Sequence, residues 1–302
     1  MEIRRFAAID IGSNSVRLLI ANVLQNGEGP FFKKSALIRV PIRLGVNAFT
    51  DHRIPEVTIK HLVETMLAFK YLMRANDVLH YRGCATSAMR EALNGPQIIK
   101  RIKEQAGIDI EIITGNTEAH LIFNSQNATL GKINDTCLFV DVGGGSTEIT
   151  IFNNRKAIAA KSFNIGTLRI LQKQVTKDDW KKLNAWLKLK AGKTKGFSMI
   201  GSGGNINRIS KLVNLKPGKP MPIDMLEDIM EELKRYSYDD RMKVFDLNPD
   251  RADVIIPAGE IFLNIMKSMK ADKIYVPKIG LGDGIVREVY KEYLNGKKSK
   301  LE

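Results

Sequence analysis

The residues best placed to do chemistry lie in the stretch LFVDVGGGSTEITI, residues 138–151. Its apolar beginning predicts a buried strand that ends on the carboxylate of Asp141. The glycines Gly143–Gly145 follow, and the chain passes Glu148 before a β-branched strand resumes. A glycine turn exposes backbone N–H groups to phosphate oxygens, and carboxylates hold a hard cation directly or through its waters. The pattern is typical of a metal–phosphate site, although an ordinary glycine turn without a ligand explains this stretch equally well.

A second copy of the pattern occurs near the N-terminus. Residues 8–20, AIDIGSNSVRLLI, align without gaps with residues 139–151, FVDVGGGSTEITI. Asp10 aligns with Asp141 and Gly12 with Gly143, and apolar residues match on both sides. A repeat at this distance is too long for a solenoid and indicates two domains that each begin with the same strand–turn–strand. Two such turns facing each other would hold a phosphate and a cation between them.

Three further positions have two readings each. Arg90 lies just after the start of an expected helix, where N–H groups bind anions, yet an ion pair with Glu91 explains it as well. Glu118 lies in the first turn of another expected helix, where a carboxylate is often only a favourable partner of the helix dipole. Gly203 and Gly204 open a third helix and form either a phosphate cradle or a plain turn.

Composition narrows the class of protein. A chain of 302 residues with 44% hydrophobic and 26% charged residues suits two globular domains. No apolar run approaches a membrane span and the N-terminus lacks a signal-peptide pattern, so we expect a cytoplasmic protein without membrane contact. The cysteines Cys84 and Cys137 lie in apolar surroundings and are expected to be packing residues, and the four histidines have no zinc-site spacing.

The net charge of +14 predicts a polyanionic partner. The lysines are spread along the chain, for example at Lys188, Lys193 and Lys195 and in the tail from Lys297. No helix-turn-helix, zinc-finger or aromatic RNA-binding pattern accompanies them, so nucleic acid ranks below a phosphate polymer as the partner.

Strand and helix patterns alternate along the chain and predict an α/β fold with two related domains and an active site in the cleft between them. We expect one domain over residues 1–124 and a second over 125–284, with a C-terminal helix at about 285–298 folding back onto the first. Leu44–Asn47 is expected to be a loop, and Pro257 to interrupt a helix.

Five motifs in order resemble those of one known family. They are DIGSNSVR (residues 10–17), ATSAMREALN (85–94), ITGNTEA (113–119), VDVGGGSTE (140–148) and GSGG (201–204). They are similar to the motifs of the exopolyphosphatase and guanosine pentaphosphate phosphatase family, in the actin-like ATPase superfamily. The resemblance spans almost the whole chain. It implies two ribonuclease-H-like domains and magnesium-dependent release of terminal orthophosphate from inorganic polyphosphate or from pppGpp.

The resemblance also implies roles for single residues. It favours a catalytic role for Glu118 over a partner of the helix dipole, and a catalytic role for Arg90 over an ion pair with Glu91. Glu118 would be the general base, with Arg90 beside it in the catalytic set. Asp141, Glu148 and Asp10 would position the metal, which is Mg²⁺ with Mn²⁺ as an alternative, and a monovalent cation is a further open requirement. The residues implied in phosphate binding are Ser13, Asn14, Arg17, Gly143, Gly144, Gly145, Ser146, Thr147, Gly203 and Gly204.

The chain departs from the family pattern at two places. Residues 43–48, RLGVNA, lack the glutamate of the family loop, and residues 280–284, GLGDG, lack an arginine. Both changes affect the expected recognition of the substrate's end group. The chain also ends before the helical domains that extend the polyphosphate channel in longer members, so we expect shorter substrates or a groove built by a homodimer.

Three other functions rank below the phosphatase. An ATP-dependent sugar or acetate kinase would use the glycine turn at 201–204 for adenosine. A sensor of (p)ppGpp or polyphosphate would bind without turnover and would need no general base. A nucleic-acid-binding protein is motivated by charge alone.

Overall fold

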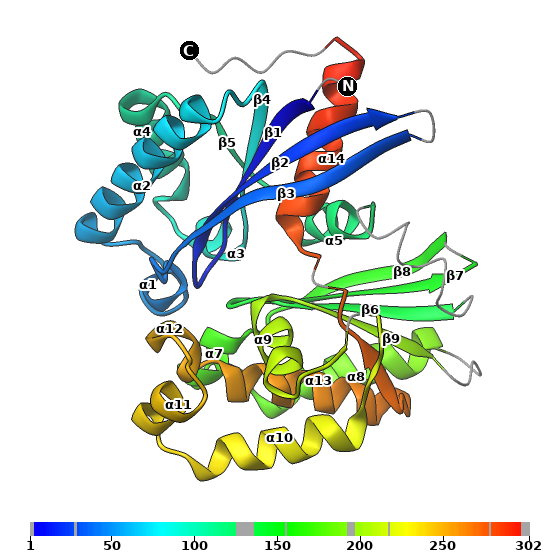
Figure 1. Ribbon diagram of the computed structural model, residues 1–302. Helices are drawn as coiled ribbons and strands as arrows, with labels where there is room; N and C mark the ends of the chain where they lie inside the picture. The colour runs from blue at the N-terminus through cyan, green and yellow to red at the C-terminus, as the bar shows by residue number, and fades with distance from the viewer. Residues whose placement is uncertain are drawn as a thin grey trace. The chain divides into compact units, whose positions relative to one another are not determined.

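The computed structural model describes residues 3–26, 29–124, 136–154, 156–191, 197–216, 218–277 and 279–296. The chain divides into two compact units (Figure 1). Unit 1 comprises residues 1–125 and 280–302, and unit 2 comprises residues 126–279. Lys193, Lys195 and the basic tail from Lys297 lie outside the described residues.

Unit 1 is a mixed five-stranded sheet with the order β3-β2-β1-β4-β5. Strands β1 to β3 are antiparallel neighbours, whereas β4 and β5 continue the sheet in parallel from β1. Figure 1 shows α2 and α4 on one face of this sheet and α14 and α5 on the other. The strands are β1 Ile3–Ile11, β2 Val16–Asn26, β3 Gly29–Val40, β4 His80–Ala85 and β5 Ile110–Ile112; the helices are α1 Gly45–Thr50, α2 Glu56–Ala75, α3 Ser87–Glu91, α4 Gly95–Ala106, α5 Gly115–Asn124 and α14 Leu281–Leu294.

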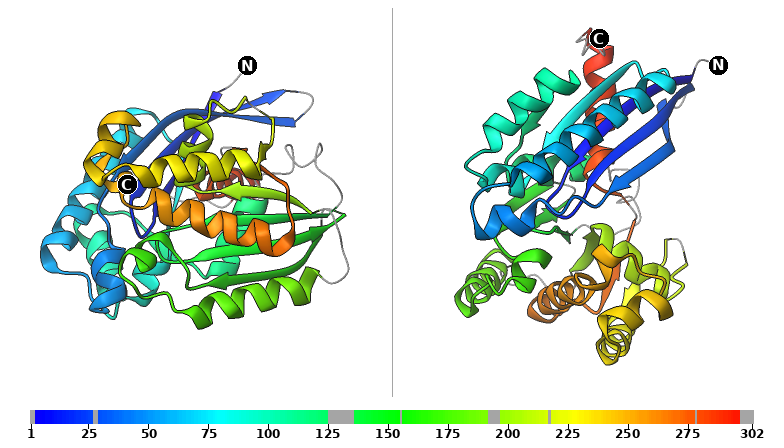
Figure 2. Two further views of the ribbon diagram at one scale, coloured as in Figure 1. Left: turned by 90° about the horizontal axis from the view of Figure 1, so that it is seen from below. Right: turned by 90° about the vertical axis from the view of Figure 1, so that its left-hand side faces the viewer.

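Unit 2 is a mixed six-stranded sheet with the order β10-β11-β9-β6-β7-β8. Its helices include the long α10 and α13, which lie side by side in Figures 1 and 2 and pack against each other. The strands are β6 Thr136–Val142, β7 Thr147–Asn153, β8 Lys156–Phe163, β9 Ser198–Ser202, β10 Met221–Pro222 and β11 Lys273–Tyr275; the helices are α7 Thr167–Leu171, α8 Lys177–Ala191, α9 Gly204–Leu212, α10 Ile223–Arg235, α11 Tyr238–Val244, α12 Pro249–Ala252 and α13 Ile255–Met269.

The sequence repeat is a structural repeat of three strands. The first hairpin turn is closed by a bond from Gly12 N–H to Ser15 O of 3.1 Å, and the second by one from Gly143 N–H to Ser146 O of 2.9 Å. Pairing with the third strand shifts register after Ile20 in unit 1 and after Ile151 in unit 2, which are aligned positions. The repeat therefore extends past the hairpins into β3 and β8.

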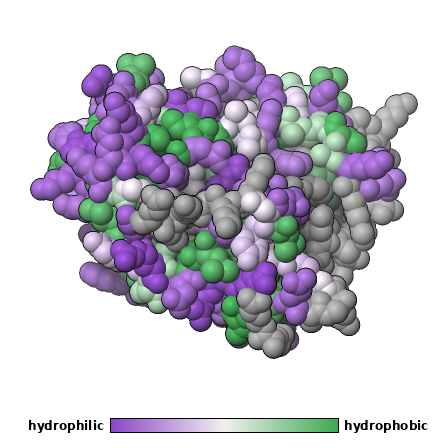
Figure 3. Space-filling view, turned by 90° about the horizontal axis from the view of Figure 1, so that it is seen from above, coloured by the Kyte–Doolittle hydropathy of each residue, from purple (hydrophilic) through white to green (hydrophobic). Residues whose placement is uncertain are grey.

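The helices were compared with the length and hydropathy that a membrane span requires. Within the described residues, no helix combines the length and the apolar character needed to cross a bilayer. On the face drawn in Figure 3, hydrophilic side chains predominate and hydrophobic ones occur in small separate groups.

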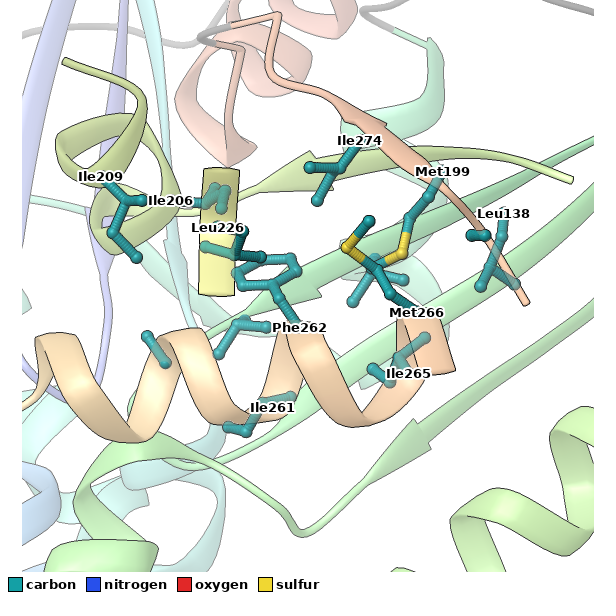
Figure 4. Close-up of a cluster of buried hydrophobic side chains, with 14 of the residues drawn as sticks. Leu138, Met199, Ile206, Ile209, Leu226, Ile261, Phe262, Ile265, Met266 and Ile274 are labelled. Carbon is teal, nitrogen blue, oxygen red and sulfur yellow. The ribbon is translucent and has the colours of Figure 1, made fainter. Parts of the chain in front are cut away.

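The core of unit 2 lies between its sheet and helices α9, α10 and α13. Helix α13 buries an apolar stripe at helical spacing, which includes Phe262 and Met266. Figure 4 shows both side chains on the side of α13 that faces the strands, among labelled residues such as Met199 and Ile274. Cys137 is buried in β6, where burial raises the pKa of its thiol to about 11, as expected for a packing residue.

Three local expectations were wrong, each for a physical reason. Residues 45–50 form α1, where a loop was expected at Leu44–Asn47. Pro257 does not interrupt α13, because it lies in the first turn of that helix, where its missing N–H has no intrahelical partner to lose. The last helix begins at Leu281, within the glycine motif, and not at about 285, because Asp283 caps its start by accepting a bond from Gly280 N–H. The expected end at about 298 lies outside the described residues.

Candidate functional site

The triple-glycine turn of unit 2 is held by its carbonyl groups. Thr167 N–H donates to Gly143 O at 3.1 Å and Leu168 N–H to Gly144 O at 2.8 Å. The Nε of Arg169 donates to Gly145 O at 2.7 Å. All three glycine carbonyls therefore accept hydrogen bonds from the start of α7, which fixes the orientation of the turn.

The N–H groups of the same turn remain available. In the described part of the chain, the N–H groups of Gly144, Gly145 and Ser146 make no backbone hydrogen bond. Consecutive N–H donors in a turn form a concave site that favours anions. Because the carbonyls are occupied on the other side, the turn presents donors alone, which matches the oxygens of a phosphate group.

Asp141 and Glu148 flank this turn as a pair. They are register partners on β6 and β7, and carboxylate oxygens of the two lie within 4.8 Å of each other. Both are buried, Asp141 to 9% exposure and Glu148 to 1%. Ser162 Oγ donates to Glu148 Oε1 at 2.8 Å. Two like charges opposite each other are unfavourable in a sheet, so this donor set fits a hard divalent cation between them.

The matching hairpin of unit 1 has a different charge arrangement. The register partner of Asp10 is Arg17, whose Nη1 lies 3.5 Å from Asp10 Oδ2. Burial raises the pKa of Asp10, and the Arg17 guanidinium offsets part of that increase. The aligned carboxylates thus differ: Asp141 faces a second carboxylate, whereas Asp10 is neutralised by its own unit.

The first hairpin turn is braced as well. Gly45 N–H donates to Ser13 O at 2.8 Å and Arg43 N–H to Asn14 O at 3.2 Å, so the loop that departs from the family pattern supports the turn through its backbone. Ser13 Oγ and Ser87 Oγ lie 2.9 Å apart, which joins the turn to the start of α3. Further along α3, Arg90 Nη1 donates to Ile113 O at 2.7 Å.

Glu118 lies in the first turn of α5. The hydroxyl of Thr114 caps this helix by accepting from Thr117 N–H at 3.1 Å. The side chain of Glu118 is buried, with 8% exposure, although it is ionisable. A buried carboxylate at a helix N-terminus keeps its charge more easily than elsewhere, because the helix dipole favours an anion there.

The third glycine turn occupies in unit 2 the place that Thr86 and Ser87 occupy in unit 1. Ser202 on β9 is the parallel partner of Asp141, just as Cys84 on β4 is the parallel partner of Asp10. A helix starts directly after each strand, α9 in unit 2 and α3 in unit 1. Each aspartate therefore has one hairpin turn and one strand-to-helix turn beside it.

The segment Ile165–Arg169 was not among the predicted site residues. A side chain on Gly166 would lie 2.4 Å from Gly144 O, so only glycine allows this approach. Thr147, predicted to bind phosphate, donates its hydroxyl to Ile165 O. The glycine before α7 was the one signal in the sequence, because bonds to carbonyls leave no side-chain pattern.

Comparison with known proteins decides the family. A model of the Ppx/GppA phosphatase family matches residues 31–292. The chain belongs to this family. The crystal structure of the Aquifex aeolicus family member is 27% identical, with a TM-score of 0.76 over 96% of this chain and 99% of that one. The fold is accordingly the actin-like ATPase fold, α/β with two mixed sheets.

Two curated relatives match the chain to different extents. The bifunctional 3-dehydroquinate synthase/phosphatase of Fusobacterium nucleatum is 28% identical over 89% of this chain, which covers 44% of that protein. Exopolyphosphatase 2 of Mycobacterium tuberculosis is 31% identical over 59% of this chain and 57% of its own length. The chain thus spans less than half the length of the Fusobacterium protein, whereas the match to exopolyphosphatase 2 is limited to a part of both chains.

Proposed function

We propose that the chain is a Mg²⁺-dependent exopolyphosphatase that releases orthophosphate from the end of inorganic polyphosphate. The observation that carries the proposal is the triple-glycine turn, whose carbonyls are held by α7 and whose N–H groups remain as donors beside two buried carboxylates. Family membership supports phosphoanhydride chemistry, and relatives named exopolyphosphatase support the polymer as substrate. The alternative substrate is pppGpp.

Each protein group has a separate task in the proposed reaction. The N–H groups of Gly144, Gly145 and Ser146 bind the terminal phosphoryl oxygens, where charge increases in the transition state. Asp141 and Glu148 would hold Mg²⁺, and Asp10 is the third residue proposed to position it. The bound Mg²⁺ would neutralise phosphate charge. Ser13, Asn14 and Arg17 bind phosphate from the first hairpin, and Arg90 and the turn at Gly203 and Gly204 from the helix starts.

Glu118 is the proposed general base. It orients a water molecule in line with the terminal bond and takes its proton as the water oxygen attacks phosphorus. The attack breaks the bond to the bridging oxygen, which leaves with the shortened chain. Little covalent help is needed for this reaction, so positioning and charge account for most of the catalysis.

The test is phosphate release with Mg²⁺ from short polyphosphate, long polyphosphate, pppGpp and ATP. We expect release from polyphosphate, and a loss of turnover of about 10²–10⁴-fold in Glu118→Gln with substrate binding retained. The exposed Glu64→Gln on α2 makes the same chemical change and should match the wild type. Turnover of pppGpp alone would show that the chain is a pppGpp phosphatase and not an exopolyphosphatase. Turnover by Glu118→Gln at the wild-type rate would show that Glu118 is not the general base.

A further inference from the structure

A cavity of about 310 Å³ lies in unit 2 at the start of α9. Gly204, Asn207, Arg208 and Lys211 line it from that helix. Asp246 and Asn248 line it from the segment that joins α11 to α12, and Arg251 lines it from α12. The lining side chains are all polar or charged. A cavity without apolar or aromatic walls does not suit a nucleobase, which binds by stacking and apolar contact.

The charge of the lining favours an anion. Three cationic side chains face one carboxylate, and that carboxylate, on Asp246, is fully exposed and lies 3.4 Å from Arg208 Nη2. The first turn of α9, a helix of nine residues, adds N–H groups at Gly204. Multiple cations around a solvent-filled space of this size match the repeated negative charge of a phosphate chain.

The two arginines shape the cavity through the backbone. Arg208 Nη2 donates to Phe245 O at 2.6 Å and also to Asp246 O, and Arg251 Nη1 donates to Gly204 O. A guanidinium has five N–H donors, and every bond from Arg208 to the described residues uses Nη2. The Nε and Nη1 groups of Arg208 therefore remain for a ligand.

Asn207 supplies an independent indication of a ligand. Its Oδ1 atom is buried and has no hydrogen-bond partner among the described residues. A buried polar atom without a partner is costly, so such atoms in native proteins call for a bound group. The amide can present either its oxygen or its nitrogen, since the two are assigned by their partners.

The cavity adjoins the carboxylate pair through one turn. Gly204 lines the cavity, and a Cβ atom on the preceding residue, Gly203, would lie 3.6 Å from Asp141 Oδ1. A chain of phosphates with its end at Asp141 would thus reach the cavity by passing these two glycines. We propose that this cavity binds the phosphates of the substrate chain that lie beyond the one being cleaved; the assignment rests on the proposed phosphatase function.

Lys211 is the residue with which to test the subsite. It is exposed, and it forms no ion pair with any described residue, so its replacement leaves the fold intact. The full chain is titrated with tripolyphosphate by calorimetry without a divalent cation, so that Asp141 and Glu148 repel the anion and the cavity is measured alone. We expect Lys211→Gln to raise Kd by about 3–10-fold and Lys211→Glu to raise it further.

The matched control is Lys188→Gln on α8, an equal charge change at an exposed position outside the cavity, which should leave Kd unchanged. With Mg²⁺ and long polyphosphate, Lys211→Gln should raise KM and leave kcat unaltered, whereas a merely structural lysine would lower kcat and Tm together. Binding of tripolyphosphate that ignores both Lys211 variants, or no binding at all, overturns the subsite even if polyphosphate is hydrolysed. Binding that depends on Lys211 without any hydrolysis upholds the subsite and rejects the exopolyphosphatase.

Discussion

Burial of Asp10 disfavours the ionised form of its side chain. Burial raises its pKa above the ordinary value of 3.8, despite the Arg17 guanidinium 3.5 Å away. The folded protein therefore binds the proton more tightly than the unfolded chain does. Below pH 3.8 the carboxyl is protonated in both the folded and the unfolded state. As the pH rises through the folded pKa, the folded protein becomes less stable, because a buried carboxyl must then carry a charge.

Asp10→Asn should remove this loss. We expect its Tm, relative to that of the wild type, to be higher at pH 7 than at pH 4, and its phosphatase activity to fall. Arg17 is a third exposed, so water replaces its lost partner. Thermal unfolding across this pH range, with the exposed Asp228→Asn as control, checks the sign. A Tm difference that is independent of pH would contradict the assignment of the cost to burial.

At the scale of elements, α14 fixes the helix that carries Glu118. A Cβ atom on Gly284 would lie 2.0 Å from Leu121 O on α5, so the two helices are in backbone contact there. Gly284→Ala must push α5 away and displace Glu118, which lies one turn earlier. We expect a loss of stability of about 1–3 kcal/mol and a fall in kcat, measured by denaturant unfolding and by phosphate release.

Gly282→Ala is the control for this prediction in the same helix. Its Cβ atom would meet Leu19 at 3.4 Å, an ordinary contact, and alanine favours a helix over glycine by about 1 kcal/mol. This variant should be as stable as the wild type or more so, with normal kcat. Equal behaviour of the two variants would show that the contact with Leu121 does not position α5.

The sequence predicts some of these elements well and others poorly. The hairpins at Asp10 and Asp141 are predictable, because apolar runs on both sides of a glycine turn are typical of two buried strands joined by that turn. The start of α14 is not, because glycines at 280–284 indicate a break in a helix unless their close packing is known. Two of the three bonds from α7 to the triple-glycine turn could not be predicted, because they come from the main-chain N–H groups of Thr167 and Leu168, which leave no pattern in the sequence. The role of Glu118 depends on family resemblance, since its position alone favours a partner of the helix dipole.

At the scale of the whole molecule, the net charge of +14 attracts any polyanion, and affinity alone does not separate polyphosphate from nucleic acid. Salt does separate them. Attraction to a diffuse positive surface falls by about 10³–10⁵ between 50 and 200 mM salt when 6–10 phosphate contacts are involved. Buried donors such as the triple-glycine turn are screened much less.

We therefore expect labelled DNA to dissociate at about 200 mM salt, while long polyphosphate stays bound to Glu118→Gln, which holds substrate without cleaving it. Fluorescence anisotropy with competing polyphosphate measures both affinities on the same protein. Lys188→Gln should weaken DNA binding slightly at low salt and leave polyphosphate affinity at 200 mM salt unaltered, because its lysine belongs to the diffuse charge. If DNA stays bound at this salt concentration and polyphosphate does not displace it, the positive surface is a nucleic-acid-binding site. Polyphosphate would then not be the polyanion that the surface binds.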